Sequence, residues 1–359
     1  HSGYFADIID FKNPLLLTVK DENQNSGYCL IDNKLSLTEL VYEPKKHQKA
    51  LISKNSLQLV YTKESYLEPP SIHKKNIKSK ASKIIYQSNA DLLNYDFGSS
   101  ALIHYKSKEG RFLKGVLIYP ANFDPNKTYP MVVHIYEKMS SLFHDFNAPS
   151  DYNVRGFNPM KYASNGYFLF YPDIKFTIGN PGMSILNCIT AGVEAVVMDG
   201  HIDPKRIGLI GQSFGGYGTL FTVTHTDIFA AAVAGAAITD FTSRYHSIGS
   251  DRRSEMYRFE HKQHRMGGSF YDMKDSYMLN SPLSSIENLN TPVILWSGKE
   301  DNHVQWTQSV MFFLGMKRLN KDGRLLLYKN ELHTLRKEEN QKHLSNQVFE
   351  WWNKYLRNE

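Results

Sequence analysis

Hydrophobic and polar positions follow two different patterns along the chain, and the pattern changes near residues 90–100. Before that point, short apolar runs are separated by polar turns such as 21–25 and 32–34. Short strands at a spacing of about 8–12 residues are typical of an antiparallel all-β unit. The runs predicted as strands are 14–20, 27–31, 37–42, 57–62 and 83–87, and no convincing helix lies among them.

After residue 100, apolar strand runs alternate with segments whose apolar side chains recur at helical spacing. Such alternation predicts an α/β fold with a doubly wound, mostly parallel sheet covered on both faces, in which chemistry lies at the carboxyl ends of strands. We therefore expect an all-β segment at 1–95 and an α/β domain at 96–359. The expected strands are 113–119, 131–136, 167–172, 207–211, 230–238, 293–297 and 325–328, and the helical patterns fall at 185–197, 306–314 and 344–355.

Composition narrows the class of protein only slightly. The chain has 359 residues, 41% hydrophobic and 22% charged, which excludes disorder, collagen-like repeats and a pure coiled coil. Lys and Arg exceed Asp and Glu by 42 − 36, or six charges, a mild excess that does not indicate a nucleic-acid partner. No run approaches the ~18–20 apolar residues of a membrane-spanning helix. The first five residues, His-Ser-Gly-Tyr-Phe, do not resemble a signal peptide.

The two cysteines, Cys29 and Cys188, are far apart and allow neither a disulfide framework nor metal-finger spacing. Cys188 belongs to a helical apolar pattern, so core packing is its expected role. The segment 260–264, Glu-His-Lys-Gln-His, resembles a metal site only superficially, because it lacks the H-E-x-x-H spacing. We interpret it as an exposed helical face and predict no metal or organic cofactor.

The strongest chemical signal is Gly-Gln-Ser-Phe-Gly at 211–215, which has the form G-x-S-x-G. The pattern alone is common, but here an apolar strand at 207–210 precedes it and a helix begins directly after it. A serine at such a turn stands clear at the sheet edge, near the positive end of a helix. The alternative is an ordinary helix-start serine in a glycine-rich turn. We predict that Ser213 is a nucleophile.

A serine hydroxyl needs a base within hydrogen-bond reach, and in this architecture the chain order is Ser, acid, His. Asp301 follows the strand at 293–297 and a glycine turn, and is favoured over Glu300 as the acid; a helix-capping aspartate is the alternative. Asp240 follows the strand directly after the nucleophile helix and fits less well. His333 lies after the next strand and is the predicted base; a solvated loop histidine is the alternative. The histidines that fit less well are His261, His264, His303 and His343.

Acyl transfer also requires hydrogen-bond donors for the developing oxyanion. One donor is the backbone N–H of Phe214, the residue after the nucleophile. The second usually comes from the loop after an earlier strand, and here the strand at 131–136 ends in Tyr136 rather than in a His-Gly-Gly-Gly loop. Position alone leaves two readings of Tyr136 equally open: a phenol hydroxyl that donates to the oxyanion, or a ring that packs on its neighbour.

Four segments of the second part of the chain carry a further signal: 203–208 (Asp-Pro-Lys-Arg-Ile-Gly), 211–218 (Gly-Gln-Ser-Phe-Gly-Gly-Tyr-Gly), 298–304 (Gly-Lys-Glu-Asp-Asn-His-Val) and 331–335 (Glu-Leu-His-Thr-Leu). Together they resemble the prolyl oligopeptidase family of serine peptidases, and members related to dipeptidyl-peptidase IV, particularly bacterial ones, look closest. The resemblance covers roughly residues 100–359. Ser213, Asp301 and His333 match the family triad, and Tyr136 matches the tyrosine whose hydroxyl serves the oxyanion.

The resemblance implies an α/β-hydrolase domain joined to a β-propeller. A blade of four strands takes about 40–45 residues, so the first ~95 residues correspond to about two C-terminal blades. Two blades do not close a ring, and we therefore expect that the chain is the C-terminal part of a longer protein; a naturally degenerate propeller is the alternative. The resemblance favours a periplasmic or secreted protein over a cytoplasmic one, and it implies pairing through the hydrolase domain as one expectation.

The resemblance also suggests residues of a proline-sized substrate pocket. Phe214 stands where related exopeptidases often carry Tyr or Trp. Phe241 and Tyr245 are candidate walls, with core packing as an equal alternative, and Tyr217 and Val304 complete the set. His303 departs from the family pattern, in which dipeptidyl-peptidases carry Asn near the substrate carbonyl.

The resulting hypothesis is a serine peptidase for short peptides, with a preference for proline or a small residue before the scissile bond. An esterase or lipase on the same fold is one alternative, because the triad does not discriminate amides from esters. A truncated hydrolase module that no longer turns over is the other.

Overall fold

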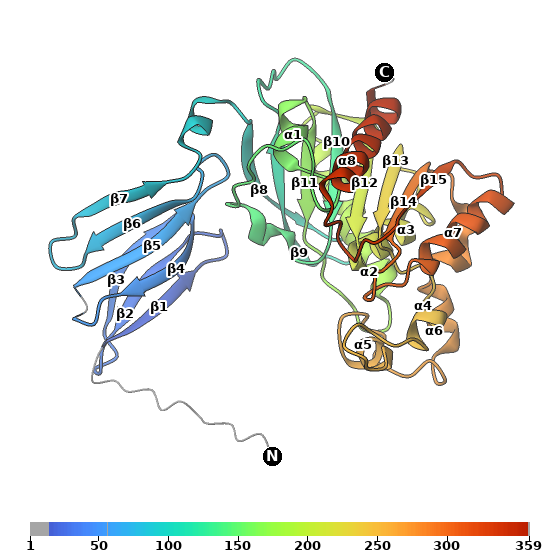
Figure 1. The fold of residues 1–359 in the computed structure, drawn as a ribbon, viewed down its shortest axis with the longest axis horizontal. Helices are drawn as coiled ribbons and strands as arrows, with labels where there is room; N and C mark the ends of the chain where they lie inside the picture. The colour runs from blue at the N-terminus through green and yellow to red at the C-terminus, as the bar shows by residue number, and fades with distance from the viewer. Residues whose placement is uncertain (1–13, 56, 358–359) are drawn as a thin grey trace. The chain divides into compact units, whose positions relative to one another are not determined.

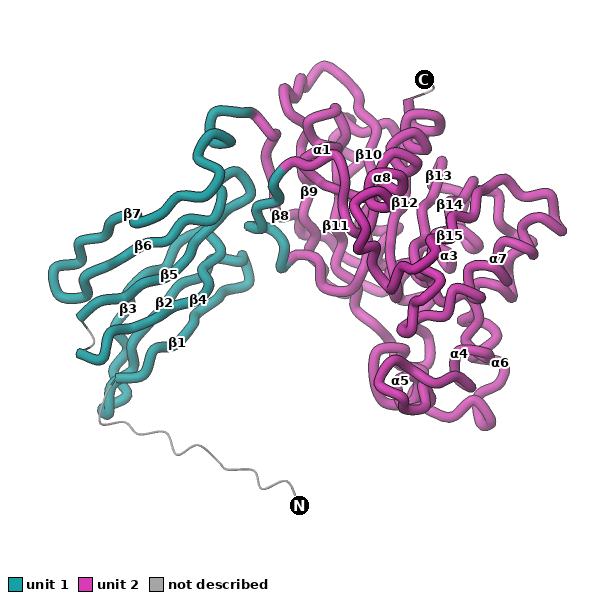
Figure 2. The backbone as a smooth tube through the Cα atoms, viewed as in Figure 1, with its two compact units in different colours: residues 1–95, 141–148 teal, residues 96–140, 149–359 magenta. Residues whose placement is uncertain are grey.

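The computed structural model describes residues 14–55 and 57–357, which form two compact units. One unit comprises residues up to 95 together with 141–148, and the other comprises 96–140 and 149–359 (Figure 2). The expected domain 1–95 begins in residues 1–13, which lie outside the described part of the chain. The first five residues, which do not resemble a signal peptide, lie outside it as well. The segment 141–148 was not expected in the first unit.

The first unit contains two antiparallel sheets. Tyr28, Leu59 and Tyr61 form much of their common core, and the rings of His47 and His73 lie 5.6 and 5.4 Å from that of Tyr61. Two of the strands, β4 and β6, were not expected, because each carries lysines that interrupt the apolar pattern. In sheet order, the first sheet is β1 (Leu15–Lys20), β2 (Ser26–Ile31) and β3 (Leu37–Glu43), and the second is β4 (Lys46–Ile52), β5 (Gln58–Glu64), β6 (Ser71–Asn76) and β7 (Ser82–Gln87).

The second unit is built on an eight-stranded sheet in the order β15-β14-β13-β12-β10-β11-β9-β8 (Figure 1). The strands from β11 to β15 pair in parallel, whereas β9 and β8 are antiparallel additions at one edge. The mostly parallel sheet confirms the predicted fold class. The strands are β8 (Ser99–Lys106), β9 (Phe112–Tyr119), β10 (Tyr129–Ile135), β11 (Phe168–Pro172), β12 (Ile202–Gln212), β13 (Ala231–Gly235), β14 (Val293–Gly298) and β15 (Gly323–Tyr328).

Helices cover both faces of this sheet, as the alternating pattern predicted. On one face, Trp352 of α8 packs so closely on Gly208 of β12 that a Cβ there would lie 2.6 Å from the indole. The next residue, Leu209, points to the opposite face, where it shares a buried cluster with Ile189 of α2. The helices are α1 (Pro159–Ser164), α2 (Pro181–Val197), α3 (Phe214–Val223), α4 (Phe241–Tyr245), α5 (Met256–His261), α6 (Lys274–Leu279), α7 (Thr307–Arg318) and α8 (Glu338–Trp352).

Candidate active site

Ser213 lies at the sharp turn between β12 and α3. Its backbone angles, φ 60° and ψ −122°, are unusual for a residue with a side chain and indicate local strain. The turn needs glycines on both sides of the serine: a Cβ on Gly211 would lie 2.2 Å from the carbonyl oxygen of Gly215, and one on Gly215 would lie 2.4 Å from that of Ile135. The chain therefore folds into the strained strand-to-helix turn that the motif predicted.

Asp301 follows β14 with its side chain fully buried. Its Oδ1 accepts the backbone N–H groups of His303 (2.8 Å) and Val304 (3.0 Å), and its Oδ2 lies 2.7 Å from Nδ1 of His333. One carboxylate oxygen is thus fixed by the turn that follows the strand, and the other faces the imidazole. The alternative acid Asp240 instead caps α4, accepting the backbone N–H of Ser243 at 2.8 Å.

His333 lies in the loop after β15, with its side chain 22% exposed. Two contacts bring this loop to the nucleophile turn and to the acid. Gln212, next to Ser213, donates from Nε2 to the carbonyl oxygen of His333 at 2.5 Å, and a Cβ on Gly298 would lie 2.2 Å from the carbonyl oxygen of Leu332. Among the described residues, a hydrogen bond joins Asp301 to His333, whereas Ser213 Oγ makes none. A contact between the serine and the imidazole is therefore a proposal and not an observation.

Glu331, which the sequence reasoning missed, holds the same loop. Its buried carboxylate accepts the backbone N–H of Arg336 (2.6 Å), that of Lys337 (3.0 Å) and the amide of Asn340 (2.7 Å). Burial alone would raise the pKa of Glu331, but these hydrogen bonds outweigh it and lower the pKa. An ionised Glu331 therefore anchors the chain two residues from His333. The only sequence signal was its place in the Glu-Leu-His segment.

Tyr136 lies directly after β10 and is 39% exposed. Its ring lies beside the nucleophile turn, because a Cβ on Gly215 would be 3.3 Å from Tyr136 Cδ2. The phenol oxygen accepts a hydrogen bond from Gln263 Nε2 at 3.1 Å, which leaves its own proton free to donate. Gln263 is held in turn by Glu137, at 2.8 Å, and Glu137 pairs with Arg265 at 2.6 Å. The ring of Tyr136 thus lies beside the nucleophile turn, and the hydrogen bond from Gln263 leaves the phenol proton available for donation.

The backbone N–H of Phe214 is the other expected donor. Phe214 is the first residue of α3, and the N–H groups of a first helical turn have no partner within the helix. The turn therefore offers this N–H next to the serine hydroxyl.

The expected pocket walls are buried instead of exposed. Phe214, Tyr217, Phe241 and Tyr245 are at most 1% exposed, and Val304 is 4% exposed. The ring of Tyr217 lies 5.3 Å from that of Phe214 and 4.6 Å from that of Phe241. In this arrangement these rings pack in the core, which is the alternative considered for Phe241 and Tyr245. Aromatic rings of the segment 259–277 pack against Phe241 and Tyr245. The sequence did not predict this contact.

A buried ionic cluster between α4 and the segment that follows it lies beside the acid loop. Arg244 and Glu255, 4% and 2% exposed, form an ion pair at 3.0 Å, and Arg244 also donates to the carbonyl oxygen of His303. Burial lowers the pKa of Arg244, although the charge of Glu255 opposes this. His264 lies 3.9 Å from Glu255 and is 3% exposed. The expected exposed helical face at 260–264 is therefore wrong for His264, because α5 ends at His261 and the chain then turns inward, whereas His261 and Lys262 are exposed.

The described residues contain no group of three or more His, Cys, Asp or Glu side chains arranged for a metal ion. Cys188 is buried, as predicted. Among the same residues, no helix is long and apolar enough to cross a bilayer.

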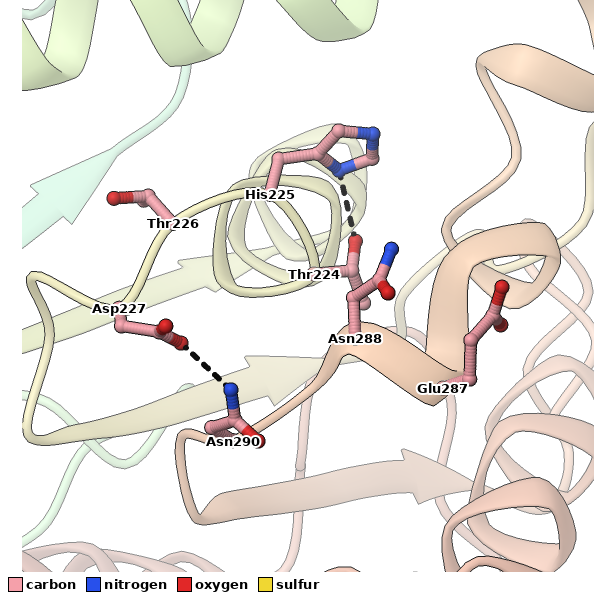
Figure 3. A pocket seen from close by; sticks show the side chains of 7 residues that line it. All are labelled: Thr224, His225, Thr226, Asp227, Glu287, Asn288 and Asn290. Carbon is pink, nitrogen blue, oxygen red and sulfur yellow. Dashed lines mark hydrogen bonds between the residues drawn. The ribbon is translucent and has the colours of Figure 1, made fainter.

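Two of the pockets formed by the described residues lie away from the serine turn. One, of about 550 Å³, is lined by residues after the far end of α3 and before β14, among them His225, Asp227 and Asn290 (Figure 3). Because α3 is ten residues long, this pocket lies ~15 Å along the helix from Ser213 and contains none of the predicted site residues. The other, of about 410 Å³, includes Gln263, the residue that donates to Tyr136.

The chain is similar to known peptidases in sequence and in fold. The chain is 28% identical over 242 residues to the uncharacterized peptidase YuxL of Bacillus subtilis, covering 65% of this chain and 35% of that protein. It is 23% identical over 318 residues to dipeptidyl-peptidase 5 of Porphyromonas endodontalis, covering 83% of this chain and 44% of that protein. The chain thus spans less than half the length of these relatives.

Among solved structures, the crystal structure of Porphyromonas gingivalis dipeptidyl peptidase 4 superimposes with a TM-score of 0.78 at 20% identity, covering 96% of this chain and 48% of that one. This likeness supports the α/β-hydrolase fold expected for the second unit. The model of the prolyl oligopeptidase family (Peptidase_S9) matches residues 178–359, which include the serine turn, the acid loop and the histidine loop. The chain belongs to the prolyl oligopeptidase family.

Proposed function

We propose that the chain is a serine peptidase in which Ser213, His333 and Asp301 hydrolyse peptide bonds through an acyl-enzyme. The observation that carries the proposal is the 2.7 Å contact between a buried, doubly anchored Asp301 and the imidazole of His333, in a loop tied to the residue before Ser213. A base oriented by a third group beside a strained serine is the arrangement that activates a hydroxyl. The contact between serine and base is often long before substrate binds.

The proposed reaction has two halves. His333 Nε2 takes the proton of Ser213 as Oγ attacks the peptide carbonyl carbon, and Asp301 holds the Nδ1 proton and stabilises the imidazolium. The oxyanion accepts hydrogen bonds from the Tyr136 hydroxyl and the Phe214 N–H. The intermediate collapses when His333 donates its proton to the leaving amine, and the carbonyl group stays on Ser213 as an ester. Water then attacks this ester by the same route and restores the serine.

Short peptides with proline or a small residue before the scissile bond are the proposed substrates. The support is the family itself and the relatives named as dipeptidyl peptidases. Because the expected pocket walls are buried, such a preference requires a small pocket at the serine turn.

The first unit is proposed to consist of two propeller blades. Its second sheet, with four antiparallel strands between Lys46 and Gln87, has the strand number and length of one blade of ~40–45 residues. Its first sheet, with three strands between Leu15 and Glu43, is shorter and is proposed to be part of a second blade. A homodimer formed through the α/β-hydrolase domain is part of the same proposal, and light scattering on the purified protein tests it.

The experiment compares a proline-type aminoacyl anilide with a short acyl ester, using the protein and its Ser213→Ala variant. Hydrolysis of the anilide that disappears in the variant supports the peptidase. Hydrolysis of the ester alone supports the esterase alternative. Absence of both reactions in a folded protein supports a module that does not turn over.

A further inference from the structure

The pocket of about 410 Å³ is formed by α5 and the chain on either side of it. The pocket is open to solvent, and its side chains Arg253, Tyr257 and Lys262 are exposed. The lining residues are Asp251, Arg253, Ser254, Tyr257, Arg258, Lys262 and Gln263.

Positive charge dominates this pocket, with three cations against one carboxylate. The carboxylate, Asp251, accepts the backbone N–H of Arg253 at 3.1 Å. Arg258 lies 3.6 Å from the buried Glu255 and stays 38% exposed, while the ammonium of Lys262 lies 5.7 Å from the centre of the Tyr257 ring. Within residues 14–55 and 57–357, neither Arg253 nor Lys262 has a carboxylate within 4.0 Å. The pocket therefore holds cationic donors whose charge the protein does not balance.

The segment 250–263, which forms the pocket, touches residues beside Ser213 and His333 at both of its ends. At one end, the lining residue Gln263 donates to the hydroxyl of Tyr136 at 3.1 Å. At the other end, Ser250, next to Asp251, lies 2.9 Å from Nδ1 of His303, whose ring centroid is 5.1 Å from that of His333. An extended peptide advances ~3.3 Å per residue, so a substrate at the serine turn reaches this pocket within a few residues of its scissile bond.

We propose that this pocket binds a carboxylate group of the peptide substrate, an inference that rests on the proposed function. A guanidinium offers paired N–H donors that match the two oxygens of a carboxylate, and an ammonium adds a point charge. The carboxylate is either the free C-terminus of a short peptide or an acidic side chain, and both present the same chemistry. The site makes the enzyme selective for substrates that carry negative charge near the cleaved bond.

The experiment measures kcat/KM of the 359-residue chain on three peptides that share one cleavable bond. The first has a free C-terminal carboxylate and an internal Gln, the second a C-terminal amide and an internal Glu, and the third, a neutral reference, an amide and Gln. We expect one carboxylate peptide to exceed the reference by about tenfold, mostly through KM, since a charge-assisted hydrogen bond contributes roughly that factor. The peptide that is favoured identifies the source of the carboxylate.

The Arg253→Gln/Lys262→Gln variant removes two exposed cations without disturbing the core. It should reduce the ratio of kcat/KM between the favoured and neutral peptides about tenfold, and rising salt should reduce the ratio in the unaltered protein. Arg318→Gln, which removes an exposed cation at the end of α7, is the matched control and should leave the ratio unchanged. Equal kcat/KM for all three peptides, or a preference that survives the double substitution, overturns the inference alone. Failure to cleave any of the three overturns the proposed function and the inference with it.

Discussion

Replacing Asp301 by Asn tests how the acid orients the imidazole of His333. The substitution keeps the shape of the side chain but exchanges one carboxylate oxygen for an NH₂ group. Oδ1 accepts two backbone N–H groups, from His303 and Val304, so the amide oxygen must take that place. The NH₂ group then faces Nδ1 of His333 and forces that nitrogen to accept. The neutral ring carries its proton on Nε2, the atom that has to receive the proton of Ser213.

The expected loss follows from this wrong tautomer and from the missing negative charge. Such a change reduces kcat by about 10⁴, or about 5 kcal/mol of transition-state stabilisation. The stability of the fold should change little, because the amide oxygen retains both hydrogen bonds from the turn.

Two measurements separate these effects: kcat/KM on the anilide substrate, and the midpoint of urea unfolding. Glu300→Gln is the matched control, since it neutralises an exposed carboxylate one residue away. A loss below tenfold for Asp301→Asn, or an equal loss for Glu300→Gln, would refute the reasoning.

Three other predictions concern the oxyanion donor, the buried ion pair and the first unit. Tyr136→Phe should lower kcat by about 10²–10³ because the oxyanion loses a donor; an unchanged kcat in steady-state assays contradicts that role. Arg244→Met should destabilise the protein by up to about 3–5 kcal/mol in urea unfolding, because the buried Glu255 loses its partner at 3.0 Å and keeps only the longer contact with Arg258 at 3.6 Å. Adding Glu255→Leu should restore stability, and an unchanged unfolding midpoint in Arg244→Met would contradict this expectation. In the first unit, hydrogen bonding to His47 is the main cause that lowers the pKa of Glu43 from 4.5 to about 2. A lowered carboxyl pKa stabilises the fold above pH 4.5 and this contribution is lost as the pH falls to about 2. Glu43→Gln should therefore cost roughly 1–3 kcal/mol at pH 7 and little at pH 2, and a difference that does not vary with pH contradicts the assignment.

Local patterns explain why much of the catalytic fold could be predicted. The apolar strand, the glycine-flanked serine and the following helix are adjacent in sequence, so their conformation is encoded within about fifteen residues. Asp301 and His333 could be predicted because the carboxyl ends of parallel strands lie at the same edge of the sheet. An acid and a base that act on Ser213 must therefore each follow the end of a strand. Their contact across 32 residues follows from this rule.

The features that the sequence did not predict depend on contacts between residues far apart in the chain. Strands β4 and β6 carry lysines on their surface, which hides the alternation of apolar residues. The ion pair of Arg244 with Glu255 and the burial of His264 arise because the segment after α4 turns inward, and the charged sequence suggested the opposite. That same segment covers Phe241, whose aromatic ring was equally compatible with a pocket wall or a core position.

Labelling with a fluorophosphonate, followed by mass mapping of the modified peptide, tests the central claim most directly. An activated Ser213 predicts a single adduct on that residue, formed much more slowly in His333→Ala and absent in Ser213→Ala. A folded protein that takes up no label, or labelling that persists in Ser213→Ala, would contradict the account.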